Sequence, residues 1–227
     1  MKCHDGVPLP LIVRKCIDYV EENGLCMEGI YRVSAAKSRL DDLEEQINKS
    51  HVVELSNVHE ATGLLKRYVR QLPENVLTQE MRGTFEEIAA KCPCRSLPFC
   101  RCLQTDILKA QLSRLPEENF YLLAYIFLHS QRVIYHKDEN KMGVGALGLL
   151  LQAMFCVSQT LIRIFLLNAS DLLSRDKQLE DASPAVFLFS DVKYKRSVFV
   201  VFYVYLSVFI IRYRMKQLSL TDPYPAI

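Results

Sequence analysis

The sequence contains little glycine or proline and almost no net charge. Eight of its 227 residues are glycine and nine are proline, whereas 50% are hydrophobic and 24% are charged. This composition argues against a long disordered tract. A formal net charge of +2 provides no bulk attraction to nucleic acid or to a membrane surface, and basic residues are not interleaved with aromatic ones. We therefore expect one globular domain, since domains commonly hold about 100 to 200 residues, and no nucleic-acid partner.

The sequence also lacks the motifs of an independent active site. It has no Gly-x-Ser-x-Gly turn, no glycine-rich phosphate loop and no His-Glu-x-x-His pair. We predict that the protein is not itself an enzyme and has no cofactor of its own. The scattered histidines have no nucleophile or metal-ligand partner at a recognised spacing, and we interpret them as ordinary surface or core residues: His51, His59, His129 and His136.

The N-terminal residues show no secretory signal. Met1–Asp5 lead into proline-containing and then helical sequence, without the apolar core that a signal peptide requires. We therefore expect a cytoplasmic protein, in which the eight cysteines are mostly reduced thiols.

Four of these cysteines follow the pattern Cys-x-Cys-x₅-Cys-x-Cys. Four thiolates can in principle hold one zinc ion. Adjacent-but-one cysteines are a poorer chelate than the usual Cys-x₂-Cys pair, so we predict no metal site and a surface loop with free thiols. The four residues are Cys92, Cys94, Cys100 and Cys102.

Apolar residues recur at helical spacing over most of the sequence. A stripe from Ile12 to Val20 ends at Gly24, which we expect to cap that helix. Because no alternating strands joined by turn dipeptides occur, the sequence predicts an all-α fold. Further helical stretches are predicted at residues 40–47, 58–72, 77–88, 107–115, 119–134, 143–154 and 157–174.

Arg32 lies in a setting that suits an outward-facing role. It belongs to the segment Glu28–Ser34, in which Ser34 is placed to cap a helix that we expect to begin at Ala35. A short connection anchored by helices on both sides can aim an arginine at a partner. The planar, permanently charged guanidinium suits phosphate oxygens in particular.

A second basic feature follows on the predicted helix at residues 58–72. Lys66 and Arg70 stand four residues apart and share one face, where like charges repel by about 0.2 to 0.5 kcal/mol in an isolated helix. Such a pair suits a site that receives an anion or an acidic partner. The alternative interpretation is a solvated basic face.

Five blocks follow one another along the sequence: Gly6–Pro10, Cys26–Ser34, Leu65–Glu74, Leu115–Phe120 and Asn140–Met142. In this order they resemble the Rho GTPase-activating protein (RhoGAP) domain family. The resemblance covers roughly residues 5 to 175. Within the family, Leu72–Leu77 and Val157–Leu161 are most similar to the Ral-binding branch.

The resemblance implies a single helical bundle that stimulates GTP hydrolysis by a GTP-bound Rho or Rac-like small GTPase in signal transduction. Arg32 would be the arginine finger, supplied in trans to the partner's nucleotide site. Lys66 would contact the switch region of the GTPase, and Arg70 would brace the finger loop. The nucleotide and its Mg²⁺ would belong to the partner.

The sequence departs from the family pattern at two places. Four residues beyond Met142 the family usually has an asparagine that contacts the GTPase, and this chain has Ala146. The later Gly-Pro-Asn element is replaced by Gln152–Met154, although the Ral-binding branch departs there too. The alternative function is therefore a catalytically weakened module that binds the GTPase.

The resemblance predicts a RhoGAP-like domain over residues 1–180 and a divergent apolar tail over residues 185–227. Residues 197–211 are apolar or weakly polar and lie between basic clusters, but the run is shorter than the roughly 17 to 20 residues of a membrane-spanning helix. Three interpretations stay open: a short membrane anchor, a helix or strand packed on the domain, and an aberrant end of the coding sequence such as a retained intron.

An anchor would associate the protein with a membrane, where it could act as a tethered scaffold through its tail. The Ral-binding branch continues into a long charged coiled coil, which this tail does not resemble. Ral binding is therefore not expected.

Overall fold

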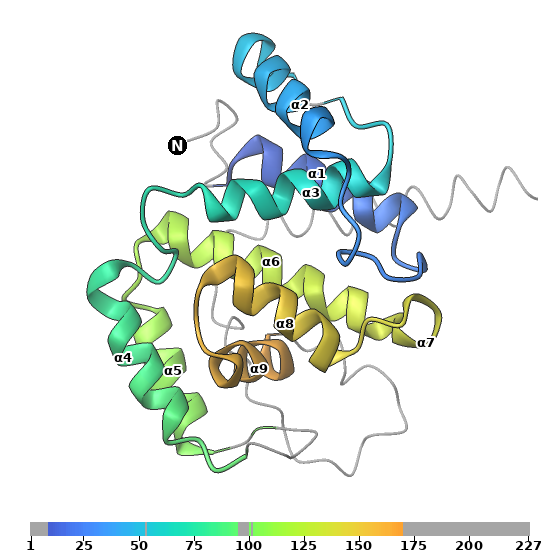
Figure 1. Ribbon diagram of the computed structural model, residues 1–227. Helices are drawn as coiled ribbons and strands as arrows, with labels where there is room; N and C mark the ends of the chain where they lie inside the picture. The colour runs from blue at the N-terminus through green and yellow to red at the C-terminus, as the bar shows by residue number, and fades with distance from the viewer. Residues whose placement is uncertain (1–8, 53, 95–99, 101, 170–227) are drawn as a thin grey trace, which may run out of the picture. The chain divides into compact units, whose positions relative to one another are not determined.

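Helices form all the regular secondary structure of the described residues (Figure 1). The computed structural model describes residues 9–52, 54–94, 100 and 102–169, and within these no strand occurs, which confirms the all-α prediction. The predicted tail at residues 185–227 lies outside the described residues. The helices are α1 (Leu11–Asn23), α2 (Lys37–Ser50), α3 (Val58–Arg70), α4 (Gln79–Ala90), α5 (Leu103–Leu112), α6 (Glu117–Tyr135), α7 (Lys137–Asn140), α8 (Val144–Phe155) and α9 (Gln159–Asn168).

Helix α3 supports the connection between α1 and α2. It packs along α1 and also contacts α2 (Figure 1). Two glycines permit these close approaches: a Cβ on Gly24 would lie 2.6 Å from Val58 Cγ1, and one on Gly63 would lie 2.9 Å from Leu40 Cδ2. Gly24 also ends α1, as predicted, and its N–H donates to the Val20 carbonyl oxygen at 2.8 Å. Helix α3 therefore fixes the two helices between which the α1–α2 connection runs.

Aromatic side chains from four helices fill the core around α6. Phe127 stacks on Phe155 with ring centroids 5.6 Å apart, and it meets the edge of Phe165 at 5.2 Å. Phe165 also contacts Phe85 of α4 at 6.4 Å. Each of these rings is at least 97% buried. Large rings in such arrangements bury much apolar area and add about 0.5 to 1.5 kcal/mol per pair, so this cluster fixes α4, α8 and α9 around α6.

Three asparagines within or beside the blocks that resemble the RhoGAP family hold loops to helices. The Nδ2 of Asn75 donates to the carbonyl oxygen of Phe155 at 2.6 Å, and that of Asn119 donates to Val76 at 2.9 Å. Asn140 is fully buried. Asn75 and Asn119 are half-buried. A buried amide such as that of Asn140, left without partners, would destabilise the fold by about 1 to 3 kcal/mol, so these blocks have a structural role.

The loop that precedes α2 differs from the prediction. Helix α2 begins at Lys37, not at Ala35, and its N-terminal flanking residue is Ala36, which makes no side-chain cap. The predicted cap at Ser34 is wrong, because the Ser34 hydroxyl accepts a hydrogen bond from Lys66 instead. Local spacing assigned the Ser34 side chain to the start of α2, but Ser34 binds Lys66, which is distant in the sequence.

The segment between α4 and α5 also differs from the prediction. We predicted a surface loop with free thiols. The four cysteines form no disulfide, but Cys92, Cys94 and Cys100 are buried and Cys102 is half-buried, so the thiols do not lie at the surface.

Among the described residues, no single helix has both the length and the hydropathy of a membrane span. Helices α8 and α9 reach these values only when taken together, and they are bent by 118° relative to each other. The apolar run at residues 197–211 lies outside the described residues.

Candidate functional site

Arg32 lies on the connection between α1 and α2, which we call the 24–36 loop. The backbone of this loop is hydrogen-bonded internally and to a distant segment. The Arg32 N–H donates to the carbonyl oxygen of Gly29 at 2.8 Å, and the Gly29 N–H donates to that of Asn140, also at 2.8 Å. The Asn140 side chain in turn donates to the carbonyl oxygens of Leu25 and Val133 at 2.7 and 2.8 Å. The loop is thus tied to the end of α6 and to α7.

The residue before Arg32 has an unusual backbone conformation. Tyr31 has φ of 68° and follows Gly29 at 69°, a region that costs a non-glycine residue of order 1 to 3 kcal/mol. Compensating contacts come from its side chain, which is 5% exposed and whose hydroxyl lies 2.6 Å from His129 Nε2. With Tyr31 fixed inward, the adjacent Arg32 is exposed.

A buried polar chain continues behind Tyr31. His129 Nδ1 lies 2.9 Å from Glu21 Oε1, and Arg132 donates to the other carboxylate oxygen of Glu21. Burial alone would raise the pKa of Glu21, but the hydrogen bonds and charges of His129 and Arg132 together lower it. Side-chain contacts thus link Tyr31 of the 24–36 loop, through His129 of α6, to Glu21 of α1.

Lys66 contacts the 24–36 loop directly from α3. Its Nζ donates to the Tyr31 carbonyl oxygen at 2.7 Å and to the Ser34 hydroxyl oxygen at 2.5 Å. The residue is 8% exposed. Burial, with a smaller effect from the nearby charge of Arg70, lowers the pKa of Lys66 from 10.5 to about 8. Lys66 therefore braces the loop, a role that the resemblance gave to Arg70. The brace by Arg70 and the contact between Lys66 and a partner stay predictions.

The side chains of Arg32 and Arg70 differ from that of Arg67 in their partners. Arg67 Nη1 donates to Asp41 at 2.6 Å and to Glu44 at 3.0 Å, and so pairs α3 with α2. Arg32 and Arg70 are exposed, and neither guanidinium group makes a hydrogen bond or ion pair with another described residue. These two guanidinium groups are the cations of the site that are left for an external anion.

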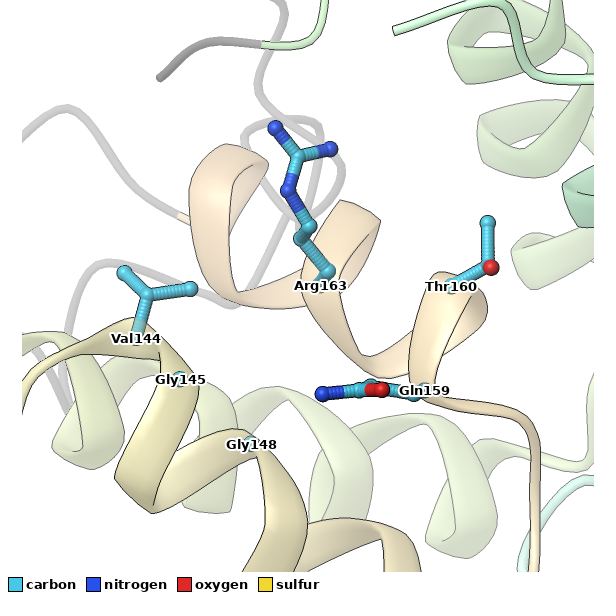
Figure 2. Close-up of a pocket in the computed structure, with 6 residues that line it drawn as sticks. All are labelled: Val144, Gly145, Gly148, Gln159, Thr160 and Arg163. Atoms are coloured by element: carbon cyan, nitrogen blue, oxygen red, sulfur yellow. The ribbon is translucent and has the colours of Figure 1, made fainter. Parts of the chain in front are cut away.

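Helix α8 carries the positions at which the sequence departs from the RhoGAP pattern. Ala146 is half-buried and Ala153 is exposed. Because an alanine side chain has no donor or acceptor, neither can form a side-chain hydrogen bond there. Beside Ala146, a groove of about 210 Å³ lies between α8 and α9 (Figure 2). All of its polar side chains come from α9, namely Gln159, Thr160 and Arg163, whereas α8 contributes only Val144, Gly145 and Gly148.

One group of potential metal ligands lies beside the 24–36 loop. Cys26 Sγ is 3.5 Å from His136 Nδ1, and that nitrogen is 3.6 Å from Glu139 Oε1. Cys26 and Glu139 are exposed. Only three ligand atoms converge, and the geometry gives no sign of a closed site.

A family model described as the RhoGAP domain matches residues 10–160. The chain belongs to the RhoGAP family. It is 35% identical to RalA-binding protein 1-A of Xenopus laevis over 172 residues, which cover 74% of this chain and 25% of that protein. It is 33% identical to Rho GTPase-activating protein 29 of Rattus norvegicus over 168 residues, or 64% of this chain and 13% of that protein. The predicted family resemblance is confirmed.

Solved structures of this RhoGAP fold are similar to the described helices. The BH domain from Graf, the GTPase regulator associated with focal adhesion kinase, matches with a TM-score of 0.60 and 22% identity over 70% of this chain and 90% of that one. Human Rho GTPase activating protein 15 matches with a TM-score of 0.61 and 24% identity over 72% and 82%. The RhoGAP chain described here spans about a quarter of the length of RalA-binding protein 1-A.

Sequence reasoning singled out Arg32, Lys66 and Arg70, whose roles toward a partner stay predictions, but it missed the residues behind them. Tyr31 and His129 are 98 positions apart, and His129 and Glu21 are 108 apart. No local spacing signals such contacts. The interpretation of His129 as an ordinary residue overlooked its place beneath the 24–36 loop.

Proposed function

We propose that this RhoGAP chain stimulates GTP hydrolysis by a Rho or Rac-like small GTPase by supplying Arg32 in trans. The observation that carries the proposal is an exposed arginine whose guanidinium group has no hydrogen-bond partner among the described residues, on a loop whose backbone is held by other segments. The names of several relatives, such as Rho GTPase-activating protein 29, support this activity.

In this mechanism the Arg32 guanidinium donates hydrogen bonds to the phosphate oxygens that gain negative charge as the γ-phosphoryl group leaves. The partner supplies the nucleotide and Mg²⁺. A finger supplied in trans contributes on the order of 10³ to 10⁵ in rate, or roughly 4 to 7 kcal/mol of barrier. So large a contribution requires a charge that is already in position, because ordering a loop upon binding costs free energy.

The fixed backbone of the 24–36 loop meets that requirement. Lys66 holds the carbonyl oxygen of Tyr31, the residue directly before the finger, and Asn140 holds Gly29. The loop conformation is therefore established in the absence of a partner, and only the Arg32 side chain has to become ordered when the GTPase binds.

Lys66 and Arg70 would complete the docking face. An ammonium group has three N–H donors, and two of those on Lys66 are directed to Tyr31 and Ser34. The third is available for a carbonyl or carboxylate of the GTPase switch region. Arg70, exposed one turn further along α3, would meet an acidic residue of the partner.

A second candidate function is a module that binds the GTPase without accelerating hydrolysis. The observation that favours it is the loss of hydrogen-bonding side chains on α8, where Ala146 replaces the usual asparagine. A missing hydrogen bond near charge weakens an interaction by about 1 to 3 kcal/mol. Cytoplasmic localisation and a membrane contact through residues 197–211, with a tethered scaffold role, remain proposals from the sequence.

Single-turnover GTP hydrolysis by a panel of Rho, Rac and Ral-type GTPases tests the proposal. The full chain is compared with Arg32→Ala and with Arg114→Ala, a matched control that removes an exposed arginine outside the 24–36 loop. Arg32→Ala should abolish most of the acceleration and leave GTPase affinity within a few fold, because the finger acts mainly in the transition state.

Other results would separate the candidates. GTPase binding without acceleration by the folded wild-type chain would favour the binding module. Loss of binding in Arg32→Ala would contradict the role that we give to this residue.

A further inference from the structure

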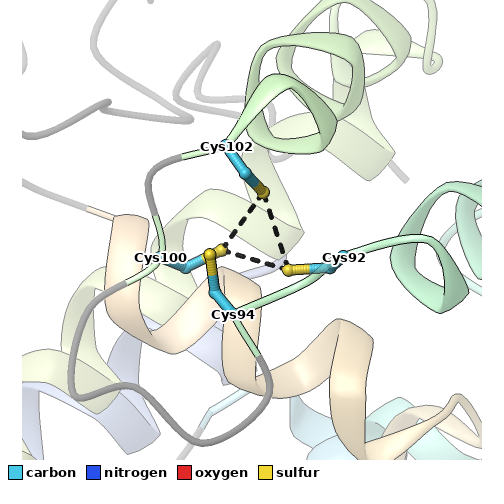
Figure 3. Close-up of side chains that lie close together, drawn as sticks. All are labelled: Cys92, Cys94, Cys100 and Cys102. Atoms are coloured by element: carbon cyan, nitrogen blue, oxygen red, sulfur yellow. Dashed lines mark hydrogen bonds between the residues drawn. The ribbon is translucent and has the colours of Figure 1, made fainter.

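Four cysteine sulfurs meet between α4 and α5 (Figure 3). Cys92 and Cys94 follow α4, and Cys100 and Cys102 precede α5. All four Sγ atoms lie within 4.8 Å of one another. Cys92 Sγ is 3.4 Å from Cys100 Sγ and 3.6 Å from Cys102 Sγ, and the latter two are 3.8 Å apart. The two segments thus place four equivalent soft ligands around one point.

These separations match the edges of a metal–thiolate tetrahedron. A zinc–sulfur bond of about 2.3 Å gives about 3.8 Å between sulfurs in tetrahedral geometry. The three separations among Cys92, Cys100 and Cys102, at 3.4 to 3.8 Å, are close to that edge and form one face of such a tetrahedron. The Sγ of Cys94 lies within 4.8 Å of the other three. A polynuclear iron–sulfur cluster would need its cysteines further apart to hold several irons. The space among the four sulfurs fits a single ion.

The surroundings of the sulfurs resemble those of a structural metal site. Thr105 is fully buried, and its hydroxyl lies 3.6 Å from Cys100 Sγ and 3.8 Å from Cys102 Sγ. A hydroxyl in this place can donate to metal-bound sulfur and orient it. Arg163 Nη1 donates to the Cys94 carbonyl oxygen at 2.7 Å, which ties the cysteine segment to α9 and places a cation beside it.

The position of Cys102 also favours a thiolate. It is the residue at the N-terminal end of α5, and the Thr105 N–H donates to its carbonyl oxygen at 2.9 Å. The partial positive charge of a helix N-terminus stabilises negative charge placed there. Free thiols could pack as small apolar groups, but that would not require four of them to converge on one point. The other described cysteines, Cys16, Cys26 and Cys156, lie apart from this cluster.

We propose that Cys92, Cys94, Cys100 and Cys102 bind one zinc ion in a closed tetrathiolate site. The four thiols each release a proton as four zinc–sulfur bonds form. Because all coordination positions are filled by protein, the site has no open position for a substrate and is structural. Its role would be to cross-link the end of α4 to the start of α5 and, through Arg163, to α9. None of these helices flanks the 24–36 loop that carries Arg32.

Metal analysis of the full chain, purified under reducing conditions with zinc supplied, tests the proposal. We expect about one zinc per chain in the wild type and the loss of most of it in Cys100→Ser. Cys26→Ser is the control, because it disrupts the other group of potential ligands, formed with His136 and Glu139. It should retain the zinc. Three outcomes would each overturn the assignment. They are a wild-type chain without zinc, a Cys100→Ser chain that retains its zinc, and iron in place of zinc.

A measurement on the wild type avoids any dependence on how well Cys100→Ser folds. Co²⁺ added to the metal-free chain should give the intense visible bands of tetrahedral cobalt together with sulfur-to-cobalt charge transfer, at a ratio of one to one. Zinc should then displace the cobalt and abolish the bands. Weak octahedral-type absorption, or disulfides found among the four cysteines by mass spectrometry of the reduced preparation, would contradict a tetrathiolate site.

Discussion

The 24–36 loop and the cysteine segment between α4 and α5 are both irregular connections fixed by side chains from other helices. In the first, Lys66 and His129 hold Tyr31, and the adjacent Arg32 is left exposed. In the second, Arg163 holds the Cys94 backbone, and the reactive sulfurs turn inward. The same kind of support therefore serves two purposes: one connection presents a charge to a partner, and the other gathers ligands within the fold.

This difference predicts that the two connections respond to different measurements. Changes at the exposed end of the 24–36 loop should alter the rate of GTP hydrolysis and leave stability intact. Changes in the cysteine segment should alter stability and leave the chemistry of Arg32 intact.

The largest expected effect is on rate, at Arg32. Arg32→Ala should reduce the acceleration by about 10³-fold or more while changing the free energy of unfolding by less than about 0.5 kcal/mol, because an exposed side chain without internal partners contributes little to stability. Urea unfolding and single-turnover hydrolysis on the same preparation check both halves. A large loss of stability would mean that Arg32 also holds the loop.

The next effect is on stability, at the cysteines. If free zinc stands at 100 times its dissociation constant, its removal should lower the free energy of unfolding by about 2.7 kcal/mol. Thermal unfolding with and without a chelator measures this loss, and Cys26→Ser should show the same loss as the wild type. An identical melting temperature with and without chelator would contradict a structural role for the metal.

The buried Lys66 should make stability depend on pH in a particular direction. Its folded pKa of about 8 lies below the 10.5 of an unperturbed lysine, so between these values the unfolded chain still binds a proton that the folded chain has lost. Raising the pH across this window therefore favours folding. Relative to Lys66→Met, the wild type should gain up to about 3 kcal/mol between pH 8 and 10.5. Urea unfolding of both chains at several pH values gives the difference, and a flat difference would show that Lys66 is not desolvated.

The restored family residue in α8 should have a moderate effect on rate. Ala146→Asn returns an amide to the half-buried position where the family usually has one. With a net contribution of about 1 to 3 kcal/mol, it should increase the acceleration by roughly tenfold, and the gain should vanish when Arg32→Ala is added. Leu149→Asn, at an exposed position of the same helix outside both departures, serves as the control. A gain that persists without Arg32 would place the effect in binding alone.

The helices were predictable because their signal is local. Apolar spacing such as that of Val13, Ile17 and Val20 reports one buried face directly, and the motifs around Arg32 gave the family. The support beneath the loop was not predictable, since Tyr31 meets His129 across 98 residues. The same limit explains the Ser34 error, because its hydroxyl was assigned to the nearest helix although Lys66 binds it from α3.

In the cysteine segment the same limit led the sequence to predict too little. The spacing of Cys92 and Cys94 argued against a metal, because it considers one pair at a time. What brings the two pairs together is the packing of α4 against α5, which spacing does not report.

The smallest expected effect is at Arg70, and it sharpens the distinction between a residue that braces the loop and one that meets the partner. Arg70 is exposed, whereas Lys66 on the previous turn is buried against the loop. Arg70→Ala should weaken GTPase binding by about 0.5 to 1 kcal/mol, since a solvated charge contributes little, and the loss should shrink as salt is raised because screening affects exposed charges most. Hydrolysis by the saturated complex should stay unchanged. Titrations at two salt concentrations measure the first effect and single-turnover rates the second. A salt-independent loss in the saturated rate would mean that Arg70 acts on the finger itself, and the roles given to Lys66 and Arg70 would have to be reversed.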